Sequence, residues 1–407
     1  MRRVVITGMG IYSCIGRNLS EVTESLYRGR CGIIFDNERK EMGYRSALTG
    51  FVERPDLHGL LHRRFRNYMA QEGEYAYMAT REALESARIT EDYFENHVAG
   101  ILYGNDSSAK AVIETTDVIR AKKDTTLVGA GNIFQSMNST VTMILSTIYK
   151  LRGINFTISG ACASGSHAIG MAYMMISGGH EEMIICGGAQ EMNSLAFGSF
   201  DGIGAFSVRE ESPLEASRPF DKDRDGLVPS GGAATVIVES LESALKRGAP
   251  ILGEILGYGF SSNGGHISQP NVDGPSRSLR MSLQNARLKT TEIDYINAHA
   301  TSTPIGDMNE AKAIHEVFGE YNVCVSSTKG MTGHECWMAG ASEIVYSLIM
   351  MHNGFIAPNI NFHSPDEDSA KLNIIAQTKE HKINTFLSNS FGFGGTNSSL
   401  IVTKYTP

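Results

Sequence analysis

A single cysteine stands among very small residues in the stretch FTISGACASGSHAIG, residues 156–170. An apolar, strand-like run precedes it and a helix-like run follows it. At a helix N-terminus, Cys162 would lie near the positive end of the helix dipole and near free backbone N–H groups, and both favour a thiolate. The small neighbours leave a substrate room to reach the sulfur. A lone cysteine, however, is more often a small buried hydrophobic residue, by roughly three to one.

Two later stretches hold the other groups that could do chemistry. INAHATSTPIGD (296–307) ends an apolar strand with His299, and SSTKGMTGHE (326–335) brings Lys329 and His334 into a glycine-punctuated loop. Binding loops follow strand ends in α/β proteins, so these two histidines are better candidates than the others in the chain. As a bare sequence feature, the lysine could equally be a solvated surface charge.

A third stretch, LSNSFGFGGTNSSL (387–400), is a glycine-rich turn between apolar segments. Its backbone N–H groups could hold an anion. A tight hairpin with no binding role is the alternative.

Short apolar runs alternate with helix-like segments, and together they have to position these groups. We expect buried strands at RRVVITG, HVAGILYG, INFTISG, EMIICGG and AATVIVES. LSEVTESLYRG and EGEYAYMATREALESARI have helical spacing, with their charged residues on the outer face. The pattern predicts an α/β fold in which helices cover a sheet.

The sequence indicates two similar halves. Residues 158–179 and 326–354 both read as a Ser/Gly-rich loop and then a helix of small residues that ends in methionines and glycine. The first of these helices has no charged side, so we expect it to be buried all round. The helix-like SLESALKRGAP stops at Gly248, which places the boundary near residue 250, with halves 1–250 and 251–407.

Length and composition narrow the function classes. A chain of 407 residues exceeds what one hydrophobic core usually supports. The net charge of −8 argues against a nucleic-acid binder, and no apolar run is long enough to span a bilayer, so we expect a cytoplasmic protein with no membrane partner. The six cysteines form no CxxC pair, which argues against a zinc cage and a disulfide framework.

Several motifs, taken in order, resemble one enzyme family. GACASG, AHATSTPIGD, STKGMTGH and NSFGFGGTN, with RRVVITGMGI at the start and the segment RPFDKDRDG, resemble the elongating β-ketoacyl-acyl carrier protein synthases of the thiolase superfamily, closest to class I. The resemblance covers essentially the full length. It implies a thiolase-like five-layer α/β/α/β/α fold and a 3-oxoacyl-acyl carrier protein synthase, an acyltransferase of fatty-acid elongation. Such enzymes condense malonyl-carrier protein, with loss of CO2, onto an acyl chain held on the cysteine.

The resemblance also implies roles for single residues. Cys162 matches the nucleophile, and His299 and His334 match the pair that assists decarboxylation. Lys329 matches a lysine that orders the site, and we expect it to pair with Glu310. Phe393 matches the gate, and its backbone N–H with that of Cys162 would form the oxyanion hole. Two hydroxyl residues match the positions that bind the pantetheine arm, Thr301 and Thr303.

Partners and ions follow from the same resemblance. An acidic acyl carrier protein needs a basic landing patch, and two clusters match the family's docking positions, although charge runs are often only solvated faces: Arg63, Arg64 and Arg66, and Arg120, Lys122 and Lys123. We expect a homodimer, with a heterodimer containing a chain-length factor as the alternative. No cofactor is required beyond the carrier's phosphopantetheine. Four residues match positions around a structural monovalent cation in some members: Asn297, Glu343, Ser388 and Asn389.

The chain departs from the family pattern beside the second histidine. ECWMAGAS replaces a run of very small residues, so Trp337 and Met338 bring bulk to the start of a packed helix, and Ala300 stands where glycine is usual. We therefore weigh a ketosynthase of a specialised polyene, pigment or type II polyketide pathway as the alternative. A non-catalytic chain-length factor would lack Cys162, and a degradative thiolase would have a second cysteine near the C-terminus.

Overall fold

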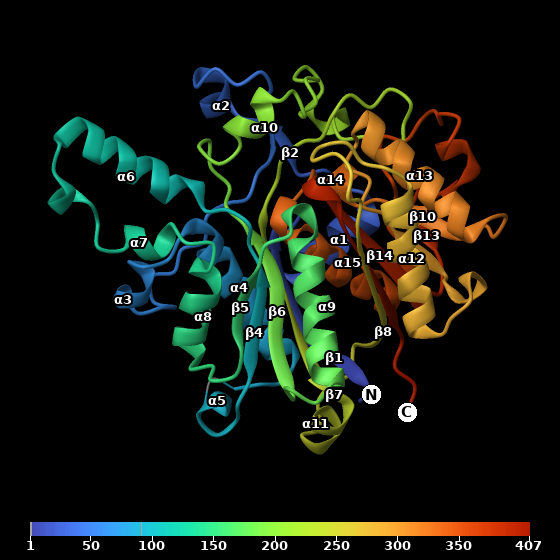
Figure 1. The fold of residues 1–407 in the computed structure, drawn as a ribbon, viewed down its shortest axis with the longest axis horizontal. Coiled ribbons are helices and arrows are strands. Elements are labelled where there is room, and N and C mark those ends of the chain that lie inside the picture. The colour runs from blue at the N-terminus through green and yellow to red at the C-terminus, as the bar shows by residue number, and fades with distance from the viewer. Residues whose placement is uncertain (1, 91) are drawn as a thin grey trace.

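The computed structural model describes residues 2–90 and 92–407, and over these residues eleven strands form one mixed sheet (Figure 1). The five strands expected from the sequence are all present. In spatial order the sheet contains β12 (Asn373–Ile374), β10 (Cys324–Ser326), β9 (Tyr295–Asn297), β14 (Thr385–Gly392), β15 (Thr396–Thr403), β8 (Gly253–Ser262), β1 (Val4–Ser13), β7 (Gly232–Ser240), β6 (Met183–Gln190), β4 (Gly100–Gly104) and β5 (Asn155–Ile158).

The sheet repeats one strand order on both sides of its middle. From the antiparallel β1–β8 pair outward, the order is β1, β7, β6, β4, β5 on one side and β8, β15, β14, β9, β10 on the other. The inner strands on both sides are antiparallel, and the outer ones are parallel. This repeat confirms a fold of two similar halves. The predicted division at residue 250 falls between α11 (Leu241–Lys246) and β8, and as a domain boundary it stays a prediction.

Two buried helices form the middle layer. α9 (Ser164–Ser177) packs on β4, β6 and β7, α15 (Ala339–Asn353) packs on β7 and β14, and the two helices contact each other. Short 3-10 turns precede them, η2 (Ala161–Ala163) before α9 and η5 (Cys336–Met338) before α15. Ala161 and Cys336 both have a φ of 46°, so the two turns share an unusual backbone conformation.

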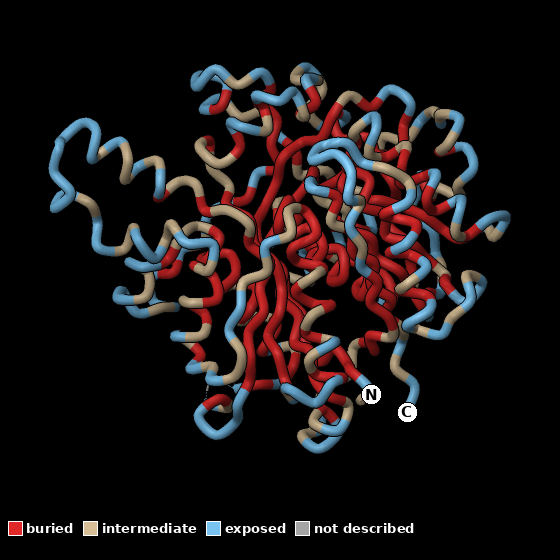
Figure 2. Tube along the Cα trace, in the orientation of Figure 1, coloured by how far each residue is buried: buried red, intermediate tan, exposed pale blue. Residues whose placement is uncertain are grey.

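The two halves of the sheet form separate layers around the middle helices, and outer helices complete the five layers. α4 (Gln71–Ser86) packs on β1 and β7 and carries α8 (Thr140–Tyr149), and α12 (Asp273–Ala286) packs on β8 and β15 and carries α13 (Pro304–Phe318). In Figure 2 much of the red lies in the strands β1, β4, β6 and β7 and in the two middle helices. The remaining elements are α1 (Leu19–Arg28), α2 (Asn37–Glu41), α3 (Arg63–Arg66), α5 (Tyr93–Asn96), α6 (Ala109–Lys122), α7 (Asn132–Gln135), α10 (Gly198–Gly202), α14 (Lys329–Thr332), β2 (Ile33–Phe35), β3 (Leu48–Gly50), β11 (Phe355–Ile356) and β13 (Lys379–Glu380).

Burial differs from the sequence expectation in three places. β5 was expected to be buried, but it is the outermost strand, and Phe156 is 55% exposed. α9 is not buried all round, because Met174 on its second half is exposed. Conversely, Glu72 and Glu74 of α4 are buried although charged residues were expected on the outer face. Within the described residues, no helix has the length and apolarity needed to cross a membrane.

The middle helices approach each other closely at glycine. A Cβ added at Gly340 would lie 2.5 Å from the backbone nitrogen of Ser166, and one added at Gly165 would lie 3.0 Å from the backbone nitrogen of Ala341. Contacts this short cannot be relieved by a side-chain rotation, since one partner is backbone.

We therefore expect Gly340→Ala to destabilise the protein by about 1–3 kcal/mol, the usual cost of overpacking a core. The change should appear as a lower Tm in a thermal scan. Gly202→Ala, where an added Cβ has no neighbour within 4 Å, is the matched control and should leave Tm nearly unchanged. Equal Tm values for the two variants would contradict the close approach.

Candidate active site

Cys162 lies in η2, between β5 and the N-terminus of α9, as the sequence predicted. The side chain is buried, in an apolar cluster with Cys336 and Trp337. The expected preference for thiolate is wrong for this conformation. Burial raises the pKa of the Cys162 thiol to about 12, because it outweighs the Lys329 charge and the backbone N–H of Phe393, both of which lower it.

The two predicted histidines lie side by side although 35 positions separate them in sequence. His299 follows β9, His334 follows α14, and their ring centroids are 5.4 Å apart at an interplanar angle of 89°. Burial, followed by the nearby Lys329 ammonium, lowers the pKa of both imidazoles well below the usual 6.5, so both rings are neutral at pH 7. Among the residues that the structure describes, Nδ1 of His299 and both ring nitrogens of His334 have no hydrogen-bond partner.

Lys329 is buried and forms an ion pair with Glu343 of α15, not with Glu310. The expected Lys329–Glu310 pair is therefore wrong. The Glu310 carboxylate instead accepts the backbone N–H of His299 at 2.9 Å and that of Ala300 at 2.6 Å, and the side-chain amide of Asn389 at 3.1 Å. Its role is to hold the His299 turn.

The Lys329 charge links the candidate groups. It opposes the burial-driven rise in the pKa of Cys162, and it lowers the pKa of His299 and His334. A single buried ammonium thus lies within electrostatic range of the thiol and both imidazoles. Of the four residues that the sequence proposed as catalytic, His299 and His334 are in ring contact, and the Lys329 charge acts on both of them and on Cys162.

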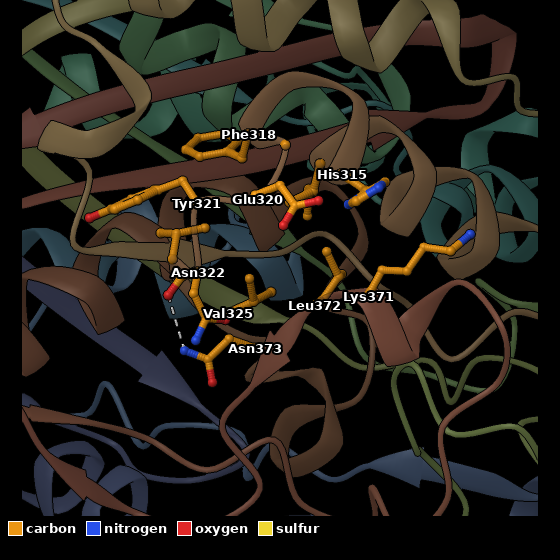
Figure 3. Close-up of a pocket in the computed structure, with 12 residues that line it drawn as sticks. His315, Phe318, Glu320, Tyr321, Asn322, Val325, Lys371, Leu372 and Asn373 are labelled. Atoms are coloured by element: carbon orange, nitrogen blue, oxygen red, sulfur yellow. Dashed lines mark hydrogen bonds between the residues drawn. The ribbon is translucent and has the colours of Figure 1, made fainter.

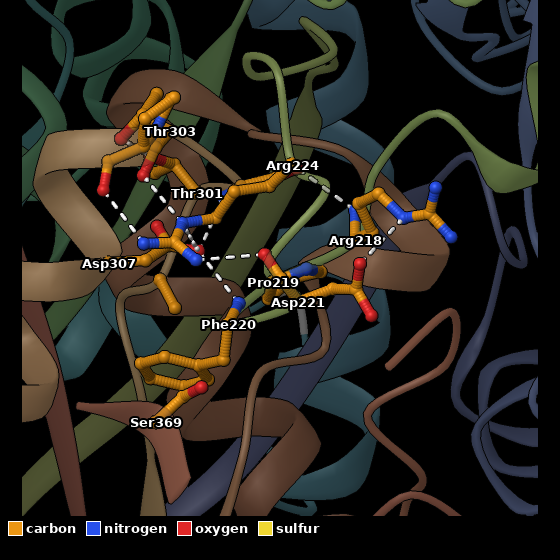
Figure 4. Close-up of polar contacts among 12 residues, drawn as sticks. Arg218, Pro219, Phe220, Asp221, Arg224, Thr301, Thr303, Asp307 and Ser369 are labelled. Carbon is orange, nitrogen blue, oxygen red and sulfur yellow. Dashed lines mark hydrogen bonds and ion pairs between the residues drawn. The ribbon is translucent and has the colours of Figure 1, made fainter. Parts of the chain in front are cut away.

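The two predicted threonines lie in one turn, with their hydroxyl oxygens 3.1 Å apart. Figure 4 shows that the Arg224 side chain lies against this turn and is bonded to it. Its guanidinium donates to the backbone carbonyls of Thr303 at 3.2 Å and Pro304 at 2.8 Å, and it lies 3.8 Å from the Asp307 carboxylate. Sequence reasoning missed the role of Arg224, although the segment RPFDKDRDG that contains it had marked the family.

Phe393 lies in the turn η7 (Phe393–Gly395), and its ring is 41% exposed. The ring stacks on Phe200 at a centroid distance of 5.8 Å and an angle of 21°. Gly394 and Gly395 have φ values of 77° and 76°, which a side chain would strain. The glycines after Phe393 thus serve the backbone conformation of this turn.

Five aromatic residues are linked by ring contacts, three of them share an apolar cluster with Cys162, and we refer to the five as the aromatic cluster: Phe197, Phe200, Phe206, Trp337 and Phe393. Only Trp337 and Phe393 were singled out from the sequence. The phenylalanines of LAFGSFDGIGAFS were missed, and their density in a glycine-rich stretch was the available signal. Of the other departures from the family pattern, Met338 and Ala300 are buried in the core away from this cluster.

The four residues expected around a cation are all buried. Within the part of the chain that the structure describes, Asn297 Oδ1, Glu343 Oε2 and Ser388 Oγ have no hydrogen-bond partner. Asn389 is engaged already, because its Oδ1 accepts the Ser399 hydroxyl at 2.9 Å. Three of the four side chains therefore fit a cation that prefers neutral and anionic oxygen. No group of three or more His, Cys, Asp or Glu residues in the described ranges is placed to hold a metal ion.

The two basic clusters lie away from Cys162. The first is on α3, where Arg63 and Arg64 are exposed and Arg66 is half-buried, and the second is at the far end of α6. Both lie on the same side of the molecule, at the left of Figure 1.

Two surface pockets also lie away from these groups. The pocket in Figure 3, about 220 Å³, is lined by residues of α13, β10 and the chain around Lys371. A second pocket, about 770 Å³, lies between the end of β1 and α4. Cys162, His299, His334 and Lys329 line neither of them.

Comparisons with known proteins agree with these motifs. The beta-ketoacyl synthase N-terminal domain matches residues 1–244, and the C-terminal domain of the same family matches residues 252–363. The chain is 42% identical to 3-oxoacyl-[acyl-carrier-protein] synthase 1 of Haemophilus influenzae, with all of both chains covered. Among solved structures, a beta-ketoacyl synthase from Burkholderia phymatum superposes with a TM-score of 0.94 at 33% identity, again over both whole chains.

A second similar solved structure contains a type II PKS acyl-carrier protein in complex with its ketosynthase bound to the hexaketide. It has a TM-score of 0.89 and 28% identity to this chain, and all of both chains are covered. Two matched domains in the family's own order, and 42% identity over the full length, leave one assignment: the chain belongs to the beta-ketoacyl synthase family.

Proposed function

We propose that this protein catalyses the decarboxylative Claisen condensation of malonyl-acyl carrier protein with an acyl chain held on Cys162, which gives 3-oxoacyl-acyl carrier protein. One observation carries the proposal: two neutral imidazoles with unpartnered ring nitrogens lie around the same buried ammonium as the Cys162 thiol. Buried polar atoms are nearly always hydrogen-bonded. These free nitrogens are therefore available to form hydrogen bonds with the substrate.

The first half-reaction loads the enzyme. The Cys162 sulfur attacks the carrier's thioester carbonyl, the bond from that carbonyl to the pantetheine sulfur breaks, and the cysteine proton leaves with the pantetheine thiolate. Lys329 and the backbone N–H of Phe393 both favour the thiolate form of Cys162. They stabilise the sulfur anion as the proton departs. Cys162 can therefore rest as a neutral thiol and still form the anion during the reaction.

The second half-reaction makes the carbon–carbon bond. The malonyl carboxylate leaves as CO2, and the electron pair forms an enolate whose oxygen accepts N–H groups from His299 and His334. The enolate carbon attacks the acyl-Cys162 carbonyl, whose oxyanion accepts the backbone N–H groups of Cys162 and Phe393. Collapse releases the Cys162 thiolate, which takes up a proton. The loss of CO2 drives the reaction, so no cofactor is needed beyond the carrier's phosphopantetheine.

The turn that carries Thr301 and Thr303 suits the carrier's arm. Thr301 is buried, Thr303 is half-buried, and both hydroxyls share one turn directly after His299. Two adjacent hydroxyls can bond the amides of a phosphopantetheine chain. Arg224 would hold them in register from the protein side.

A monovalent cation fits beside this site. Asn297, Glu343 and Ser388 would hold it through their unpartnered oxygens, and Glu343 already fixes Lys329. The ion would offset part of the buried negative charge of Glu343 and so steady the position of Lys329.

The two steps can be separated by substitution. Cys162→Ala should abolish acyl loading by acyl-carrier protein, measured as the mass increase of the intact enzyme. His299→Asn should still load but should release CO2 from malonyl-carrier protein about 100-fold more slowly, the usual loss for one oxyanion donor.

Cys186→Ala and His180→Asn are the controls, because Cys186 lies in the core on β6 and His180 is exposed after α9. Both should behave like the unchanged enzyme. Acyl loading that survives Cys162→Ala would overturn the assignment of the nucleophile.

The basic clusters on α3 and α6 would dock the acidic carrier protein. Arg63 and Arg64 are exposed, as are Arg120, Lys122 and Lys123 at the end of α6. Complementary charge speeds encounter between such partners more than it strengthens the final complex. An enzyme with a net charge of −8 needs a local basic surface for this purpose.

Charge reversal tests the docking surface. Arg63→Glu combined with Arg66→Glu should raise KM for carrier-bound substrates about tenfold, because steering of the carrier is lost. KM for a small thioester analogue should not change. Arg277→Glu with Arg280→Glu, on the distant helix α12, is the control. Equal effects on both substrates would remove the docking assignment.

We also propose a homodimer joined at β5. The outer edge of this strand has unpaired backbone groups, which proteins normally cover. The segment after α6 also has exposed apolar residues: Leu127 is 58% exposed, Ile133 57% and Phe134 43%. Apolar side chains gathered in this way mark an interface.

Phe156→Asp should therefore convert a dimer of about twice the 44.2 kDa chain mass into a monomer, measured by sedimentation equilibrium. Val98→Asp is the matched control, since Val98 has the same 55% exposure as Phe156. A monomeric unchanged protein would argue instead for a partner chain such as a chain-length factor.

A further inference from the structure

The aromatic cluster is packed against the nucleophile. Phe197, Phe206 and Trp337 are 1%, 3% and 7% exposed, and they share one apolar cluster with Cys162. The acyl chain on Cys162 must therefore lie against these rings. This step rests on the proposed function, because it takes Cys162 as the acyl carrier.

The rings form a series of nearly parallel faces that begins at the gate. Phe393 lies on Phe200 at 21°, and Phe200 lies on Phe206 at 10° with 6.2 Å between centroids. Trp337 leans on Phe200 at 6.3 Å, and its indole N–H donates to the Ser107 hydroxyl at 3.2 Å. The hydrogen bond fixes the orientation of the indole beside Phe200.

Phe393 matches the family's gate, and movement of its ring away would leave the face of Phe200 open to an incoming chain. A flat, conjugated chain offers a π face to Phe200 and so restores the stacking that gate opening removes. A saturated chain cannot do so, and it must also fix a three-fold torsion at every C–C bond. The dense packing of the other rings leaves little spare volume for such a flexible chain.

We propose that the acyl chain carried on Cys162 is a planar conjugated one, a polyenoyl or arylalkenoyl group, and that the aromatic cluster selects it. Trp337 and Phe200 are the specificity-determining residues. Phe200 provides the face on which the chain stacks, and Trp337, held by Ser107, narrows the space beside it. In this proposal, Trp337, whose bulk distinguishes ECWMAGAS from the family's usual run of small residues, selects the substrate.

A competition experiment tests the proposal. The full-length enzyme is mixed with equal amounts of octanoyl-carrier protein and octatrienoyl-carrier protein, and the two acyl-enzyme masses are followed with time. The unchanged enzyme should load the trienoyl chain at least about fivefold faster. Trp337→Leu and Phe200→Leu should bring the ratio of the two rates close to one.

The rate ratio is internal to each sample, so partial loss of folded enzyme does not alter it. Phe206→Leu is a third variant should either of the first two fail to fold, and its ratio should also fall. Tyr93→Leu, an aromatic-to-aliphatic change on the distant helix α5, should keep the ratio of the unchanged enzyme.

Equal loading of both chains by the unchanged enzyme, a preference for octanoyl, or a ratio untouched in all three cluster variants would each overturn this inference while leaving the condensation intact. Absence of loading with either chain, or loading that persists in Cys162→Ala, would instead defeat the proposed function. The two failures are therefore distinguishable.

Discussion

The close approach of the two middle helices is the constraint on which the site depends. α9 and α15 pack at Gly165 and Gly340, where the backbone of one helix touches the other. Cys162 precedes the first helix directly, and His334 precedes the turn that leads into the second. Because Gly165 and Gly340 have no side chains, the helix that follows Cys162 and the helix that follows His334 can pack closely together. The same crossing buries both helix starts, which removes water from the thiol.

Buried charge is the second organising feature. Lys329 lies among three buried carboxyl groups, those of Glu310, Glu335 and Glu343. Burial raises the pKa of each, to about 7, 7 and 8, and the Lys329 charge opposes that rise. Each carboxyl also has local partners: Glu335, for example, accepts the hydroxyls of Ser342 and Tyr346. The single Lys329 charge thereby reduces the free-energy cost of burying these carboxyl groups. Burial, with the Lys329 charge as a second cause, lowers the pKa of both imidazoles, so each neutral ring carries one N–H that can donate a hydrogen bond.

Much of the architecture could be predicted from the sequence because apolar runs and glycine stops are local signals. They predicted β1, β4, β6 and β7, and the repeated loop before each middle helix. The same signal predicted β5 as a strand but missed its exposure, because an apolar edge strand has the same sequence pattern as a buried one. For the site, motif order predicted that Cys162, His299, His334 and Lys329 would meet. It could not predict that Lys329 pairs with Glu343, since both acids are distant in sequence and only packing decides between them. Nor could it give the net effect on the Cys162 thiol, because desolvation depends on every neighbour at once.

The side chain at position 337 has a further consequence. It is the one tryptophan of the chain, and it lies in the same apolar cluster as Cys162. Its indole N–H donates to the Ser107 hydroxyl, and its ring contacts Phe200. Tryptophan fluorescence from this protein therefore comes from a single indole in the compartment around Cys162. The molecule carries a built-in optical reporter of what occupies that compartment, and no label has to be attached to observe it.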